Sequence, residues 1–119
     1  VSLHTLLNDQ TRNLIDAEAI AQMKPGAFLI NTARGGLIDE AAVAAACRAG
    51  RLGGYGGDVL VHEPPEPGHP FTDIDSIIIT PHIGSASTAT RVKMARARSF
   101  TPSARAALSI PCRISFHAR

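Results

Sequence analysis

The chain has 119 residues, of which 45% are hydrophobic and 4% aromatic, enough for one domain with a core of aliphatic side chains and alanine. No stretch approaches the roughly 20 apolar residues that cross a bilayer, so no membrane partner is predicted. Residues 1–95 hold 7 basic and 10 acidic residues (net −3), and residues 96–119 hold 5 basic and no acidic residues (net +5). The acidic body and the motif-free basic tail give no reason to expect nucleic acid as a partner.

The first predicted element is the end of a buried strand at residues 1–4, which a polar loop follows. Asp16 is a suitable N-cap for a short helix that reaches Met23, because its carboxylate can accept a backbone N–H of the first turn. Lys24-Pro25-Gly26 then stops this helix. Residues 27–31 are a short apolar run between breakers, which predicts a fully buried strand.

The later elements are predicted, in chain order, to be a helix, two strands and a helix: residues 40–49, 55–60, 77–80 and 87–94. Asp39 caps the first of these helices and Gly50 closes it. Four prolines keep residues 62–71 out of any regular structure. The last helix begins at Ser85 or Ser87 and runs to at least Met94.

Strands that alternate with helices through short loops predict an α/β fold, with a parallel sheet and helices on its faces. In such sheets, ligands bind beyond the carboxyl ends of the strands. Polar groups follow all the predicted strands: His4, residues 31–34, residues 58–63 and residues 80–82. We therefore expect a functional site at this edge of the sheet.

Arg34 follows a strand and precedes Gly35 and Gly36, which permit tight backbone geometry and close approach of a ligand. A guanidinium in this position can bind a carboxylate through two parallel hydrogen bonds. The alternative is a surface arginine that pairs with Asp39 or Glu40. The local sequence leaves both interpretations open.

His82 lies just beyond a buried strand, and a histidine can give and take a proton near neutral pH. A carboxylate bonded to the imidazole, such as Glu63, would favour the charged ring and fix its orientation. A protonated histidine can then deliver a proton to a carbonyl, and a positioned acid–base group accelerates such a step about 10²–10⁴-fold. The alternative for His82 is a structural histidine at the strand end. The alternative for Glu63 is a solvated charge in an exposed, proline-rich loop.

Asp58 follows two glycines at a strand end, where its carboxylate could accept a hydrogen bond from an amide or a ribose hydroxyl of a cofactor. The alternative is an Asx-type bond to the local backbone. His62 and His69 are expected to lie in a solvated loop. They are therefore weaker candidates than His82.

No cluster of His, Cys and carboxylate residues has metal-ligand spacing, so no metal is predicted. Cys47 lies in the alanine-rich helix and is expected to be a small core residue, which fits a reducing, cytoplasmic setting. No G-x-G-x-x-G motif follows a strand. Residues 53–57 are rich in glycine but precede strand residues instead of opening a helix, so they do not predict a pyrophosphate loop.

Residues 96–119 differ abruptly in composition from the rest of the chain, and Pro102 and Pro111 interrupt any regular period. Two interpretations stay open: a peripheral, disordered extension, or a change of reading frame near Ala95, which the abrupt shift favours. Because Val1 already belongs to a strand, we also expect that the chain is part of a longer protein.

Three segments together resemble the D-isomer-specific 2-hydroxyacid dehydrogenase family, in order and in spacing. Residues 23–39 resemble its arginine motif, residues 58–64 its acid motif and residues 80–84 its histidine motif. The resemblance covers about residues 1–95. It implies the C-terminal part of a Rossmann-like, doubly wound NAD-binding domain, without the glycine-rich βαβ half and the substrate domain. It also implies a parent protein that is a homodimer.

The resemblance implies that Arg34 binds the substrate carboxylate and polarises the carbonyl, and that His82 is the acid–base with Glu63 as its partner. The positions that match contacts with NAD are Thr5, Thr32, Ala33, Arg34, Asp58, His82, Gly84 and Ser85. The cofactor, NAD with NADP as the alternative, would supply the hydride to a small 2-keto acid. The chain on its own is expected to be inactive.

Two other hypotheses stay open. Residues 54–58 and 69–71 also resemble formate dehydrogenases, which typically have glutamine where Glu63 stands, because oxidation of formate places no proton on the substrate. Glu63 therefore favours a 2-hydroxy acid. The last hypothesis is a non-catalytic interaction module, since members of the family have been recruited as transcriptional corepressors.

Overall fold

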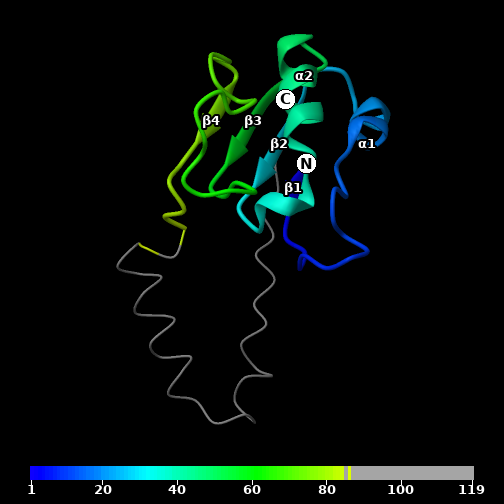
Figure 1. The fold of residues 1–119 in the computed structure, drawn as a ribbon. Coiled ribbons are helices and arrows are strands. Elements are labelled where there is room, and N and C mark those ends of the chain that lie inside the picture. The colour runs from blue at the N-terminus through cyan, green and yellow to red at the C-terminus, as the bar shows by residue number, and fades with distance from the viewer. Residues whose placement is uncertain (85, 87–119) are drawn as a thin grey trace. The chain divides into compact units, whose positions relative to one another are not determined.

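A computed structural model describes residues 1–84 and residue 86 of the chain (Figure 1). The elements in chain order are β1 (Ser2–Leu3), α1 (Ala17–Gln22), β2 (Ala27–Asn31), the 3-10 helix η1 (Gly35–Leu37), α2 (Glu40–Arg48), β3 (Leu52–Gly57) and β4 (Ile77–Ile79). The four strands form one parallel sheet in the order β1-β2-β3-β4. The predicted α/β fold with a parallel sheet is therefore confirmed.

Both helices begin where their caps were predicted. The Asp16 carboxylate accepts a hydrogen bond from the Ala19 amide (2.9 Å), and the Asp39 carboxylate accepts one from the Ala42 amide (3.0 Å). Each bond satisfies a backbone donor that has no partner within the first turn of a helix. Gly50 adopts a φ of +67° after α2, a conformation that favours glycine and ends the helix.

The hydrophobic core lies between the two helices and one face of the sheet. Its most deeply buried apolar side chains come from β2, η1, the residue before Asp39, α2 and β3: Leu29, Leu37, Ile38, Val43 and Leu52. Cys47 belongs to this core, as predicted, and burial raises the pKa of its thiol despite a hydrogen bond with Ser76.

The opposite face of the sheet is apolar and exposed, so the prediction that residues 27–31 are fully buried was wrong. Phe28 is 64% exposed and Ile78 is 69% exposed, whereas Leu29 is fully buried. Successive side chains of a strand point to opposite faces, and the core covers the Leu29 face alone. The register aligns Ile30 with Gly56 and Gly56 with Ile78, which continues the exposed face across three strands.

The third strand also differs from its prediction, because β3 consists largely of the glycine-rich segment and ends before Leu60. A side chain at Gly53 would place its Cβ 2.4 Å from the Gly26 carbonyl oxygen, and one at Gly54 would lie 2.8 Å from the Ser76 carbonyl oxygen. Only glycine fits at these two positions, because the neighbouring backbone approaches them closely.

Residues 62–71 contain no helix or strand, as the four prolines predicted. The helix predicted from Ser85 or Ser87 and the tail of residues 96–119 lie outside the described residues. Within residues 1–84 and 86, no helix combines the length and the apolar character that crossing a membrane requires.

Candidate active site

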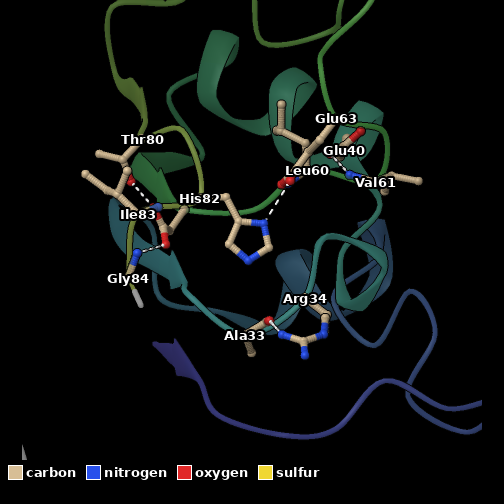
Figure 2. Close-up of polar contacts among 11 residues, drawn as sticks. Ala33, Arg34, Glu40, Leu60, Val61, Glu63, Thr80, His82, Ile83 and Gly84 are labelled. Carbon is tan, nitrogen blue, oxygen red and sulfur yellow. Dashed lines mark hydrogen bonds and ion pairs between the residues drawn. The ribbon is translucent and has the colours of Figure 1, made fainter. Parts of the chain in front are cut away.

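The carboxyl ends of β2, β3 and β4 present the three segments that the sequence singled out. Arg34 follows β2, and Glu63 lies in the segment of residues 60–71 after β3, which we call the acid loop. His82 lies in residues 80–84 after β4, which we call the histidine loop. Figure 2 shows the His82 ring between Glu63 on one side and Arg34 on the other.

Asn31, the last residue of β2, shapes the turn that presents Arg34. Its side chain is fully buried. Its Nδ2 donates to the Arg34 carbonyl oxygen (2.9 Å), and its Oδ1 accepts from the Ala33 amide (3.1 Å). Sequence reasoning did not assign this role to Asn31, although an asparagine at the end of an apolar strand is a recognisable signal for such local bonds.

The Arg34 guanidinium is exposed and donates one hydrogen bond, from Nη1 to the Ala33 carbonyl oxygen (2.7 Å). The alternative that it pairs with Asp39 or Glu40 was wrong, because Asp39 caps α2 and Glu40 bonds to the acid loop. Arg34 makes no ion pair with any residue of the described part of the chain. Most of its donors are therefore open to a ligand.

Gly35 is the point at which the Arg34 segment touches the acid loop. A Cβ added here would lie 2.1 Å from the Leu60 carbonyl carbon and 2.4 Å from the Val61 amide nitrogen. Only glycine allows the acid loop to cross so close to this backbone. The position of Arg34 is thereby coupled to the loop that carries Glu63.

His82 and Glu63 form the hydrogen bond that the sequence suggested. The His82 Nδ1 lies 2.8 Å from Glu63 Oε2, and Glu63 Oε1 accepts from the Leu60 amide (2.9 Å). These two bonds, the one from His82 first, hold the pKa of Glu63 below its ordinary value, so the group is a carboxylate at neutral pH. A carboxylate only accepts, so Nδ1 carries a proton and the other ring nitrogen, Nε2, points into the space toward Arg34 (Figure 2).

Asp58 fixes the backbone of the histidine loop. Its Oδ1 accepts from Thr80 Oγ1 (2.5 Å) and the Ile83 amide (2.9 Å), and its Oδ2 accepts from the Gly84 amide (2.7 Å). These bonds join the end of β3 to residues before and after His82. The φ of His82 is +53°, a left-handed backbone conformation that costs energy in residues other than glycine. The Asx-type interpretation was wrong, because these partners lie 22 to 26 residues away.

The carboxylate of Asp58 is charged in the folded chain. Burial alone would raise its pKa, but the three hydrogen bonds outweigh burial and the pKa is lowered. They occupy three of the roughly four acceptor sites of a carboxylate, which leaves one for a ligand. The predicted contact between Asp58 and a cofactor therefore stays a prediction.

An open cleft of about 610 Å³ runs beside the ends of β1 and β2. Its lining is formed by His4, Thr5, Leu6, Leu7, Thr32, Ala33 and Arg34. Four residues predicted to contact NAD therefore share one cleft. Neither Thr5 nor Thr32 uses its hydroxyl in a hydrogen bond with the described residues, so both are available to a polar ligand. Ser85, also predicted to contact NAD, lies outside the described residues.

His69 is not solvated, so that prediction was wrong. Its Nε2 lies 3.2 Å from Glu40 Oε2, and its ring meets the ring of the buried Phe71 edge-on at 5.0 Å. His62 is exposed, as predicted. In the described part of the chain, no three His, Cys, Asp or Glu side chains form a group that could hold a metal ion.

The fold and these three segments define a nicotinamide-binding domain of the dehydrogenase type. Residues 1–84 match the family model described as "D-isomer specific 2-hydroxyacid dehydrogenase, NAD binding domain". The chain belongs to this family of oxidoreductases.

Relatives of the chain include dehydrogenases that are named for different substrates. It is 48% identical to a glycerate dehydrogenase of Methylorubrum extorquens over 73% of this chain and 28% of that protein. It is 38% identical to a mitochondrial formate dehydrogenase of Hordeum vulgare over 80% of this chain and 25% of that protein. The crystal structure of the TT0316 protein from Thermus thermophilus superimposes with a TM-score of 0.73 at 49% identity, over 81% of this chain and 30% of that one. The chain thus spans less than a third of the length of these relatives.

Proposed function

We propose that this chain supplies the acid–base half of an NAD(P)-dependent dehydrogenase that interconverts a small 2-keto acid and a D-2-hydroxy acid. The observation that supports the proposal is the 2.8 Å bond between His82 Nδ1 and Glu63, with the opposite edge of the ring open toward Arg34. A keto acid has a carboxylate for a cation and a carbonyl oxygen for a proton donor. The two open groups match these two needs.

In the proposed reaction, Arg34 binds the substrate carboxylate through its guanidinium fork and polarises the carbonyl beside it. Protonated His82 donates its Nε2 proton to the carbonyl oxygen as the alcohol forms, and takes it back in the reverse direction. Glu63 keeps the ring oriented and stabilises its charged form. When bound, the nicotinamide cofactor supplies the hydride.

The cleft offers hydroxyls, backbone and a small side chain to that cofactor. We assign Thr5, Thr32, Ala33 and Arg34 to its binding from the cleft, and Asp58, His82 and Gly84 from the ends of β3 and β4. The open hydroxyls of Thr5 and Thr32 support this assignment. Ser85, which lies outside the described residues, is assigned from the family resemblance alone. No metal is required, because the proton is moved by His82 and the charge of the substrate is met by Arg34.

A formate dehydrogenase is the second candidate, and one of the relatives has that name. Oxidation of formate leaves no alkoxide to protonate, so it does not need a carboxylate that keeps a histidine charged. The bond between Glu63 and His82 therefore favours a hydroxy acid. We also propose a cytoplasmic parent protein, because the free thiol of Cys47 fits a reducing compartment. From the family resemblance we propose that this parent protein is a homodimer.

The test is a chimera in which residues 1–84 replace the matching segment of the Methylorubrum extorquens glycerate dehydrogenase, assayed with hydroxypyruvate, glyoxylate and formate. We expect reduction of a keto acid, with a kcat that falls about 10²–10⁴-fold in His82→Ala. His62→Ala is the matched control, because His62 is an exposed histidine of the acid loop. Full activity of the His82 variant, or turnover of formate alone, would overturn the proposal.

A further inference from the structure

The acid loop has to hold Glu63 opposite His82 without the support of a helix or strand. Residues 61–68 are all exposed, so burial of their side chains does not fix the loop. Its position must instead come from contacts near its two ends. Glu40, the first residue of α2, makes a contact at each of them.

Glu40 accepts one hydrogen bond from the start of the acid loop and one from its end. Its Oε1 accepts from the Val61 amide at 2.9 Å, and its Oε2 lies 3.2 Å from His69 Nε2. Val61 precedes Glu63 by two residues, and Val61 also crosses closely over Gly35. The carboxylate of Glu40 therefore bridges the loop around the segment that carries Glu63.

The hydrogen-bonding role of His69 follows from its two contacts. Its Nδ1 accepts from the Phe71 amide (3.3 Å), so in the neutral ring the proton is on Nε2, which donates to Glu40. The side chains of His69 and Glu40 are only 14% and 13% exposed. The Phe71 ring packs on the buried Tyr55 at 5.2 Å, which ties this end of the loop to the core.

Glu40 is not needed to cap its own helix, because Asp39 already accepts from the first turn of α2. Any acidic side chain in this turn would also interact favourably with the helix dipole. Glu18 also lies in the first turn of its helix, as the second residue of α1, where it is exposed and forms no hydrogen bond with the described residues. What separates Glu40 from Glu18 is its pair of bonds to the acid loop.

We propose that Glu40 is a positioning residue that holds the acid loop so that Glu63 can orient His82. The expected effect of Glu40 on catalysis rests on the proposed function. Its effect on the position of the acid loop does not, because that effect depends only on contacts within the chain. Without the bond to Glu63, none of the described contacts favours the form of His82 with its proton on Nδ1.

The experiment compares the 119-residue chain, uniformly labelled with ¹⁵N, with its Glu40→Ala, Glu40→Gln and Glu18→Ala variants. Long-range ¹H–¹⁵N spectra at about pH 8, where an ordinary imidazole is neutral, report the tautomer of each histidine. Amide exchange reports the Val61 bond. In the chain without substitutions we expect His82 with its proton on Nδ1 and His69 with its proton on Nε2.

In Glu40→Ala we expect exchange of the Val61 amide to become at least about tenfold faster, and His82 to shift away from the Nδ1–H form. Glu18→Ala removes an acidic residue from the first turn of the other helix and should leave both signals unchanged. An unchanged His82 in a folded Glu40→Ala chain would overturn the proposal, as would an equal change in Glu18→Ala.

Glu40→Gln provides the second variant in case Glu40→Ala does not fold. The glutamine side chain has one oxygen that accepts and one NH₂ group that donates. It can therefore replace only one of the two oxygens with which Glu40 accepts from Val61 and His69, and the other contact must be lost. We expect either faster Val61 exchange or a changed His69 tautomer, and no change in both would contradict the bridge. Because these spectra need neither cofactor nor substrate, an inactive chimera would count against the proposed function and not against Glu40.

Discussion

The Asp58 carboxylate connects the end of β3 to the Thr80 hydroxyl before His82 and to the Ile83 and Gly84 amides after it, through three hydrogen bonds that it accepts. Its pKa is lowered in the folded chain, because these bonds outweigh the effect of burial. A group with a lowered folded pKa stabilises the fold above its unfolded pKa, and this contribution is lost as the pH falls through the folded pKa. The histidine loop should therefore be sensitive to acid.

We expect the Ile83 and Gly84 amides to lose protection from exchange as the pH falls below about 4, the ordinary pKa of an aspartate, because the lowered pKa of Asp58 places its protonation below that value. Asp58→Asn should already show fast exchange at pH 7 and little further change in acid, because it keeps only one acceptor oxygen. Asp75→Asn, at an exposed aspartate before β4, should behave like the parent chain. The same acid response in Asp58→Asn and in the parent chain would contradict this role.

Some of these residue roles could be predicted from the sequence and others could not. The caps of both helices and the pairing of Glu63 with His82 were predicted, because residue type and position at a strand or helix end were informative. The bonds of Glu40 to His69 and of Asp58 to Gly84 join residues 29 and 26 positions apart. Nothing in the local sequence indicates such partners, so these contacts needed the folded structure.

At the scale of elements, the segment that contains η1 and the acid loop pack backbone against backbone at Gly35. In Gly35→Ala the new methyl group would overlap the Leu60 carbonyl, which cannot move unless the acid loop moves with it. We expect a loss of about 1–3 kcal/mol in the free energy of unfolding, measured with urea, together with loss of the bond between His82 and Glu63. Both changes have the same cause.

Gly36→Ala is the matched control, because its Cβ would meet a Leu7 methyl group at 3.0 Å, the far end of a flexible side chain. It should cost clearly less than Gly35→Ala. Equal stability losses in the two variants would show that the close crossing at Leu60 is not what makes glycine necessary at position 35.

The elements themselves were predicted well where the pattern was local. β2 has the predicted bounds, and α2 begins and ends within one residue of the prediction. β3 was placed too late, because four glycines have a low intrinsic preference for strands. Gly53 and Gly54 are needed in this strand because the Gly26 and Ser76 carbonyls leave no room for a larger residue, and that is a property of the packed sheet.

At the scale of the whole molecule, the described residues bury one face of the sheet and leave the other apolar and open. The exposed face comprises Phe28, Ile30 and Ile78. Apolar surface on a sheet face favours association, because water is released when it is covered. The face was not anticipated, because an apolar run of five residues does not reveal which of its two sides is covered.

We expect the 119-residue chain to self-associate at micromolar concentration in sedimentation velocity, and Phe28→Lys with Ile78→Lys to shift it to the monomer. Leu14→Lys is the control, since Leu14 is an exposed apolar residue in the loop before α1. A monomeric parent chain, or equal dissociation by the control, would show that this face does not drive association.

The kcat of the chimera with a Glu63→Gln substitution tests whether Glu63 and His82 act together to transfer a proton. Glutamine keeps the size and an acceptor oxygen but cannot stabilise the charged ring. We expect at least a tenfold loss of kcat for the keto acid, since a hydrogen bond to a charged group is worth about 1.5–3 kcal/mol. Glu66→Gln, at an exposed position of the same loop, should keep full activity. An unchanged kcat in Glu63→Gln would show that proton transfer by His82 does not need the Glu63 carboxylate.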